Sequence, residues 1–232
     1  QAEIFYKERL EGQIRNLALV RLVFICHNYQ AYDLLRDKLD YLDQKLAQGL
    51  YYSKRHLVNY YNNRLMLHSH YREYDRAVYY GYLSVRAQTQ DGLLYVNNLC
   101  AVLLRLNRNQ EALQVMQEAS NEAKRTKNFH NRIGFVAFYM QALHKNGRCK
   151  NAENYGDAFL RAYAKEILQY RWHLFFSVYL EAMFHQHHFE KLLKVAKQYR
   201  LRERDKLYRA KANYLPVIPV YLAAAQLREG NI

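Results

Sequence analysis

Residues 93–120 read LLYVNNLCAVLLRLNRNQEALQVMQEAS, and this stretch decides the fold. It opens with an apolar segment of helical periodicity, continues through the polar turn LNRNQ, and closes with a second amphipathic segment. A single helical hairpin of this kind cannot bury its apolar face alone, so it requires similar neighbours on either side. We therefore expect the rest of the chain to repeat the pattern.

The same hairpin pattern recurs along the chain. Turns with the start of a second helix occur at 69–83, 106–119, 145–159 and 186–199, and residues 27–42 resemble a further copy. The first inward residues of the second helices are Ala77, Ala112, Ala152 and Leu192, separated by 35, 40 and 40 residues. Self-similarity at such a period predicts a stacked helical solenoid.

The hairpin at 93–120 resembles the tetratricopeptide repeat (TPR) family. Cys100 occupies the small-residue position where the two helices of that family touch, and other core positions carry Leu103, Ala112, Met116 and Ala119. The copy at 58–85 places Leu65, His68, Ala77, Gly81 and Ser84 at these positions. The resemblance implies an all-α, TPR-like solenoid of about six stacked hairpins that wind into a right-handed superhelix.

We expect helices almost throughout, because the chain has only two prolines and eight glycines. The expected helices span about 3–26, 29–48, 53–70, 73–89, 92–106, 109–126, 130–146, 149–166, 170–186, 188–200, 203–212 and 216–229. No linker composition divides the chain, so residues 1–232 are interpreted as a single domain. The end of the sequence resembles a first helix without its partner, and we expect the natural chain to continue past residue 232.

In the TPR family, the first helices of the hairpins line a concave groove that binds peptides. The resemblance places Asn59, Asn62, Asn97, Arg105, Gln141, His144, Ser177 and Glu181 in this groove. An amide can donate to and accept from an extended peptide backbone at once, although an asparagine can equally face water. Positions 62 and 97 carry Asn where a carboxylate-binding groove would carry Lys, so a C-terminal tail is not the expected ligand.

Basic residues supply the alternative to a peptide groove. The chain has a net charge of +14, and residues 191–211 hold nine Lys or Arg and two acidic residues. The candidate basic face consists of Lys191, Lys194, Lys197, Arg200 and Arg204. Such a stripe could bind nucleic acid or another acidic partner, or could be the solvated outer face of a hairpin.

Three histidines lie close together in the sequence HQHHF at 185–189. His185 and His188 have a spacing that could place both on one helical face as metal ligands. No third ligand is evident nearby, and other copies of the hairpin also carry polar residues here. We interpret the stretch as a polar turn and predict no metal site.

No sequence motif for catalysis or cofactor binding is present. The chain lacks a glycine-rich phosphate loop, HExxH and GxSxG, so we expect no enzyme activity and no cofactor. Cys100 could be imagined as a nucleophile, but it falls on a buried helix contact. Any catalysis would belong to another domain of a longer protein.

The sequence favours a non-membrane, cytoplasmic protein. The apolar run 17–26 is short and contains Arg21, and residues 1–12 lack the apolar core of a signal peptide. Three scattered cysteines favour a reducing compartment. We therefore predict a non-catalytic scaffold or sensing arm of a larger, bacterial signalling or regulatory protein. Its partners would be a protein or peptide ligand and adjoining domains of the same chain.

Overall fold

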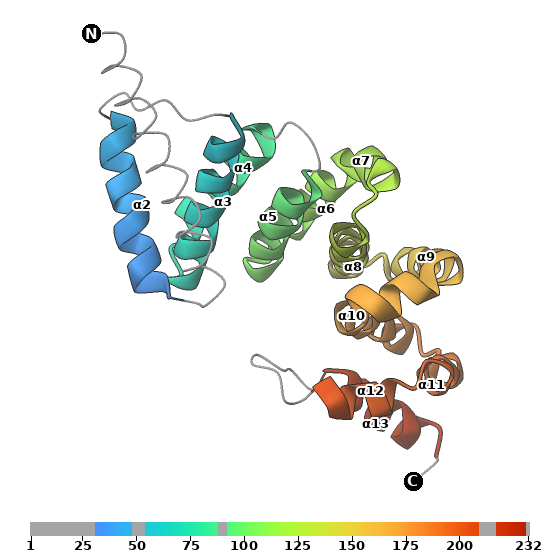
Figure 1. Cartoon of the computed structure of the whole chain (residues 1–232). Helices are drawn as coiled ribbons and strands as arrows, with labels where there is room; N and C mark the ends of the chain where they lie inside the picture. The colour runs from blue at the N-terminus through green and yellow to red at the C-terminus, as the bar shows by residue number, and fades with distance from the viewer. Residues whose placement is uncertain (1–30, 48–53, 88–91, 209–216, 231–232) are drawn as a thin grey trace, which may run out of the picture. The chain divides into compact units, whose positions relative to one another are not determined.

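The computed structural model describes residues 31–47, 54–87, 92–208 and 217–230, and every regular element in these ranges is a helix (Figure 1). The chain divides into two compact units, unit 1 at residues 1–102 and unit 2 at residues 103–232. The expected all-α helical-repeat architecture is confirmed for the described residues. The expected first helix at 3–26 and the proposed cap Asp91 lie outside them.

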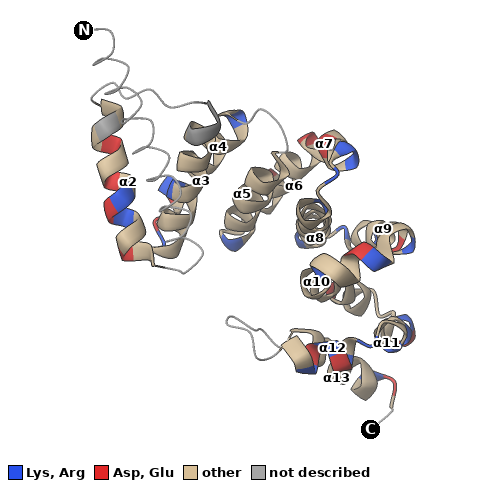
Figure 2. Ribbon diagram, in the orientation of Figure 1, with Lys and Arg blue, Asp and Glu red and all other residues tan. Residues whose placement is uncertain are grey.

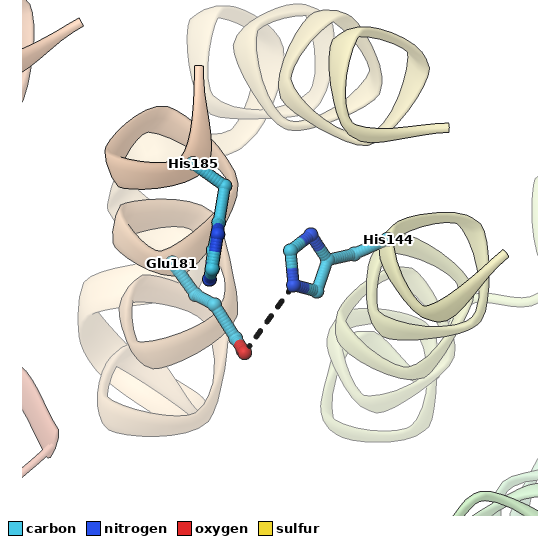
Figure 3. Close-up of side chains that lie close together, drawn as sticks. All are labelled: His144, Glu181 and His185. Atoms are coloured by element: carbon cyan, nitrogen blue, oxygen red, sulfur yellow. Dashed lines mark ion pairs between the residues drawn. The ribbon is translucent and has the colours of Figure 1, made fainter. Parts of the chain in front are cut away.

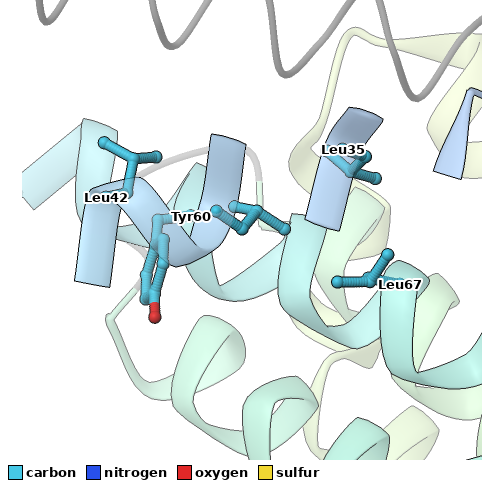
Figure 4. Packing of buried hydrophobic residues seen from close by; sticks show 5 residues of the cluster. Leu35, Leu42, Tyr60 and Leu67 are labelled. Atoms are coloured by element: carbon cyan, nitrogen blue, oxygen red, sulfur yellow. The ribbon is translucent and has the colours of Figure 1, made fainter. Parts of the chain in front are cut away.

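The described residues of unit 1 contain three complete helices and most of a fourth. These are α2 (Tyr32–Ala47), α3 (Lys54–His70), α4 (Tyr74–Ala87) and α5 (Leu93–Arg105), whose last turn crosses into unit 2. Leucines at helical spacing on α2 pack against α3, where Leu35, Leu39 and Leu42 form one core cluster with Tyr60 and Leu67 (Figure 4). Each fully buried leucine contributes about 1.5–3 kcal/mol through removal of apolar surface from water.

A buried arginine adds polar contacts between α2 and α3. The Arg64 guanidinium donates to Asp40 at 2.9 Å and also contacts Asp43, which accepts from the Tyr60 hydroxyl. Arg64 is buried, whereas the side chains of Asp40 and Asp43 are about half exposed. The buried guanidinium is therefore paired with two carboxylates, which is the condition under which a buried charge is tolerated. These contacts fix how α2 covers the first hairpin of unit 1.

Unit 2 contains eight helices in its described residues. They are α6 (Asn109–Glu118), α7 (Ser120–Arg125), α8 (Phe129–Lys145), α9 (Cys149–Tyr170), α10 (Trp172–His185), α11 (Phe189–Gln198), α12 (Leu201–Tyr208) and α13 (Val217–Arg228). Large aromatic side chains fill its core, and Phe135, Phe175, Phe176 and Tyr179 are almost fully buried. Aromatic rings supply much apolar area per side chain, which suits a core made between short helices.

The helices of unit 2 form two layers. The first helices α8, α10 and α13 contact one another in succession, whereas α9 and α11 each pack between two successive first helices. Figure 1 shows α9 and α11 on the right side of this unit, with α8 and α10 on the other side. One face of the unit is therefore made by adjacent first helices.

The turns between hairpin helices share one backbone geometry. Arg72, Asn107, Gly147 and His187 all have positive φ, between 58° and 74°. In each turn the next residue donates its N–H to a carbonyl five residues earlier, as Arg148 does to Leu143 at 2.9 Å. This is the hydrogen-bond pattern of a Schellman motif, which ends a helix with a left-handed residue. The four positions repeat at the 35- and 40-residue spacing expected from the sequence.

Most helix ends lie within a few residues of the expected ones, and three places show a change of backbone conformation that the sequence did not predict. The helix expected at 109–126 is interrupted at Ala119, where φ and ψ are −84° and 0°. The helix expected to end at 166 continues to Tyr170, with a kink at Tyr163 where φ is −138°. The segment after α11 turns at Arg200, which has φ 52°, before α12 begins.

Candidate functional site

Two of the groove asparagines on α3 form hydrogen bonds with α5. The Tyr95 hydroxyl donates to the Asn59 side-chain oxygen at 2.9 Å, and the Asn98 amide donates to the Asn62 oxygen at 2.8 Å. Both Asn59 and Asn62 remain half-buried, so part of each amide is at the surface. These contacts join adjacent first helices within unit 1.

Asn97 does not lie on the groove surface. Its side chain is buried, with 2% of the residue exposed, and a peptide cannot reach it in this conformation. The neighbouring Asn98 makes the contact to α3 instead. Successive helical residues differ by about 100° in direction, which explains why one asparagine points inward and the next does not.

The groove positions of unit 2 lie on the adjacent helices α8 and α10. Gln141 and His144 are half-buried on α8, and Ser177 and Glu181 are half-buried on α10. The Ser177 hydroxyl donates to the His173 carbonyl at 2.6 Å. Arg105, also predicted to line the groove, is exposed at the end of α5. The structure thus places Gln141, His144, Ser177 and Glu181 on two helices of unit 2 that pack against each other, and it brings His144 into contact with Glu181.

His144 and Glu181 meet a third residue, His185. Figure 3 shows His144 projecting from α8 toward α10, which carries both Glu181 and His185. His144 Nε2 lies 3.5 Å from Glu181 Oε1, and the two imidazole ring centres are 4.6 Å apart. One ligand atom from each of the three residues lies within 4.8 Å of the others. The sequence interpretation missed this cluster because it searched for a third ligand only near the histidine turn.

Two further side chains surround this cluster. His144 Nδ1 lies 3.1 Å from Cys149 Sγ at the start of α9, and the Tyr221 hydroxyl on α13 contacts the Glu181 carboxylate. Burial, together with the Glu181 charge, raises the pKa of Tyr221 to about 12. Burial alone would raise the pKa of Glu181, but His144 and the nearby positive charges hold it below its usual value.

The histidine stretch is a polar turn in part. Gln186, His187 and His188 follow the last residue of α10, and His187 takes the left-handed conformation with φ 58°. His185 is still helical and faces His144, whereas His188 Nδ1 contacts the Glu153 carboxylate at 2.8 Å. His185 and His188 are therefore in different environments and do not form a metal pair.

A charge network between α9 and α11 holds Glu153. This carboxylate, with 5% of its side chain exposed, accepts from Lys191 Nζ at 2.7 Å as well as from His188. Lys191 also donates to Asp157 at 2.6 Å. Burial would lower the pKa of Lys191, but the two carboxylates raise it above the usual value. An open cavity of about 690 Å³ lies beside this network.

The predicted basic face is not a uniform stripe. Lys191 is neutralised by Glu153 and Asp157, and Arg204 donates to the Tyr199 carbonyl at 3.2 Å. Lys194, Lys197 and Arg200 are exposed, and the lysines of α11 are among the blue positions of Figure 2. Helix α11 ends at Gln198, so the regular spacing does not continue through the segment. Residues 209–211 lie outside the described part.

Cys100 is not a nucleophile in this structure. It is fully buried, and burial raises the pKa of its thiol to about 12. The thiolate is the reactive form of cysteine, so this shift suppresses its chemistry. Across the described ranges, none of the helices combines the length and the apolarity that crossing a membrane requires.

Comparison with known proteins gives a fold relationship. No protein-family model matches the chain, and no curated protein matches it by sequence. Among solved structures, the chain is similar to the crystal structure of NprR in complex with its cognate peptide NprX. The TM-score is 0.61 at 16% sequence identity, and the match covers 100% of this chain and 69% of NprR. At this identity the likeness shows a shared TPR-like helical-repeat fold.

Proposed function

We propose that the chain is a non-catalytic module that binds a protein or peptide on the face made by its first helices. The observation that supports this proposal is the direct packing of α8 on α10, the helices that carry the half-buried residues Gln141, His144, Ser177 and Glu181. The complex of NprR with its peptide supports the proposal by showing that a chain of this fold can hold a peptide.

The chemistry of this face suits an extended chain. An extended peptide presents backbone N–H and C=O groups at regular intervals, and amide and hydroxyl side chains can pair with both kinds of group. In unit 1, Asn59 and Asn62 supply the equivalent half-buried amides on α3. Asn97 is omitted from the proposed contact set because it is buried.

The wider role that fits a binding module of this kind is a scaffold or sensing arm in a larger signalling or regulatory protein. Ligand binding would change the spacing of the stacked hairpins, since each hairpin contacts only its neighbours in a solenoid. Adjoining domains of the same chain would then respond to that change in spacing. No catalytic step is assigned to this chain.

The test starts from a displayed library of random peptides selected on the chain. Selected peptides are resynthesised with a fluorophore, and their affinity is measured by anisotropy. The double variant Gln141→Ala with Ser177→Ala should weaken binding about 10- to 100-fold, because each lost hydrogen bond costs about 0.5–1.5 kcal/mol. The matched control is Asn151→Ala with Asn154→Ala, two exposed asparagines on α9.

The outcomes separate the first-helix face from the basic surface. Binding that fails to saturate, or that weakens equally in the control variant, would contradict the proposal. Loss of binding on Lys194→Glu with Lys197→Glu, mimicked by moderate salt, would move the site to the basic surface of α11.

A further inference from the structure

Three ligand atoms of the types that transition metals prefer converge between α8 and α10. His144 comes from the last turn of α8, and Glu181 and His185 lie one turn apart on α10 (Figure 3). Residues four apart on a helix share one face, so the carboxylate and the second imidazole approach His144 from the same side. The three atoms lie within 4.8 Å of one another.

The distances match a coordination sphere better than a direct hydrogen bond. The 3.5 Å separation of His144 Nε2 and Glu181 Oε1 exceeds the usual range for an N–H···O bond. A tetrahedral zinc ion with bonds of about 2.0–2.1 Å holds its ligand atoms about 3.4 Å apart. Small side-chain rotations, chiefly of the exposed His185, would bring the third atom to this spacing.

The surrounding side chains provide the outer hydrogen bonds of such a site. When His144 binds a metal through Nε2, its Nδ1–H can donate to Cys149 Sγ, which lies 3.1 Å away. The Tyr221 hydroxyl contacts the Glu181 carboxylate and holds its orientation. Metal-binding histidines and carboxylates commonly have partners of this kind, which fix the tautomer and the position of the ligand.

We propose that His144, Glu181 and His185 form a binding site for one divalent late first-row metal ion, with zinc as the best-matched ion. Two imidazoles and one carboxylate suit zinc, cobalt and nickel rather than calcium or magnesium, which prefer oxygen ligands. Three protein ligands leave a fourth position for water or for a donor group of a bound molecule. Lys145 is the nearby positive charge that opposes the ion, and the Glu181 carboxylate offsets it.

This proposal stands independently of peptide binding. The metal site uses side chains of unit 2 alone and requires no partner, so failure of peptide selection would leave it unaffected. Failure of metal binding would likewise leave Gln141 and Ser177 available for a peptide.

The test measures zinc binding by the purified chain in competition with a chromogenic zinc chelator. The wild-type chain should bind one zinc ion per molecule, and His185→Ala should weaken this binding by at least about 100-fold, since even indirect partners contribute 10- to 100-fold. His185 is exposed, so its removal should leave helicity unchanged. Glu181→Gln should weaken zinc binding in the same way.

The matched controls come from the same histidine stretch. His187→Asn keeps a residue that tolerates the left-handed conformation, and His188→Gln keeps a polar side chain beside Glu153. Both controls should retain wild-type zinc affinity. Loss of binding in His188→Gln comparable to that in His185→Ala would overturn the assignment, because the ligands would then be turn histidines.

A cobalt spectrum identifies the donor atoms. Cobalt bound by two imidazoles and a carboxylate should give ligand-field bands without thiolate charge transfer, and these bands should be absent in His185→Ala. Thiolate charge transfer that disappears in Cys149→Ser would overturn the donor set. Absence of stoichiometric zinc or cobalt binding by the wild-type chain would overturn the proposal as a whole.

Discussion

Adjacent first helices are joined by different chemistry in the two units. In unit 1, α3 and α5 meet through neutral groups, the Asn98–Asn62 and Tyr95–Asn59 hydrogen bonds. In unit 2, α8 and α10 meet through ionisable groups, His144 with Glu181 and His185. The same repeat geometry can therefore carry either a contact between neutral groups or a contact between ionisable groups.

The second helices show a parallel difference. Gly81 on α4 and Gly156 on α9 occupy corresponding positions in their hairpins, because each lies nine residues after the left-handed turn residue. A side chain at Gly81 would meet the ends of Leu65 and Leu99, whereas one at Gly156 would meet the ring of Tyr179. The glycine in unit 2 is thus packed against a rigid aromatic ring, whereas the glycine in unit 1 is packed against flexible leucine side chains.

The largest expected contrast is the reactivity of Cys100 in unit 1 and Cys149 in unit 2. With Cys26 replaced by Ala, Cys100 should react with iodoacetamide at least about 100-fold more slowly than Cys149, because it is buried and its pKa is about 12. Mass spectrometry over a time course measures both rates. Full denaturation should equalise them, and equal rates in the folded protein would contradict the burial of Cys100.

The next contrast is the change in the free energy of unfolding when a methyl group is added at each of the two glycines. Gly156→Ala should lower the free energy of unfolding by about 1–3 kcal/mol, since its Cβ would lie 2.5 Å from Tyr179 Cδ2. Gly81→Ala should change it by less than about 1 kcal/mol, because leucine ends can shift and alanine favours the helix. Urea unfolding measures both values, and the reverse order would show that α9 yields more easily than α4.

A smaller contrast is expected in how the stability of each unit depends on pH. The pKa of Glu181 is lowered in the folded state, so its stabilising effect is present above the unfolded value near 4.5 and is lost as pH falls through the folded value. At neutral pH, Glu181→Gln should cost about 1 kcal/mol. That cost should shrink as the buffer is acidified below the unfolded pKa.

Urea midpoints for wild type and Glu181→Gln, measured with a chelator present, follow this change. Asn62→Ala serves as the neutral control, and its cost should be the same throughout the pH range. A Glu181→Gln cost that also stays constant with pH would show that the carboxylate charge does not stabilise unit 2.

The smallest expected effect concerns the neutral pair of unit 1. Asn62→Ala and Asn98→Ala should each cost about 0.5–1 kcal/mol, and the double variant should cost less than their sum because the two amides share one hydrogen bond. A double-mutant cycle from urea unfolding measures this coupling. Strict additivity would show that the hydrogen bond between Asn98 and Asn62 contributes nothing to stability.

The local features of the fold were predictable from the sequence. Turn chemistry acts over a few residues, and the left-handed positions Asn107, Gly147 and His187 fall where the polar turns were expected. Helix boundaries were predictable to within a few residues for the same reason. The exceptions are the interruption at Ala119 and the kink at Tyr163. Nothing in the composition near Tyr163 marks the kink, because no proline or glycine directly adjoins it.

The partners of polar side chains were predictable only in part. His144 and Glu181 were both expected on the first-helix face, but their meeting with His185 depends on contacts one whole repeat apart in the sequence. Asn97 is buried and Asn98 contacts α3, although the two asparagines are neighbours in the same apolar helix. Which of the two faces inward depends on the exact rotation of the helix about its axis, and the sequence pattern does not define that rotation. The sequence interpretation assigned Lys191 to a basic face without its carboxylate partners. These partners, Glu153 and Asp157, lie on the preceding hairpin, far from Lys191 in the sequence.

Photo-crosslinking from single positions tests the central claim, ligand binding on the first-helix face, most directly. A photoreactive amino acid is placed at Gln141 on α8, at Ser177 on α10, or at Glu190 on α11, and each chain is irradiated with a selected, labelled peptide. The account predicts crosslinks from positions 141 and 177 that unlabelled peptide abolishes, and none from position 190. Crosslinks from position 190 alone would contradict it and place the ligand on the second helices.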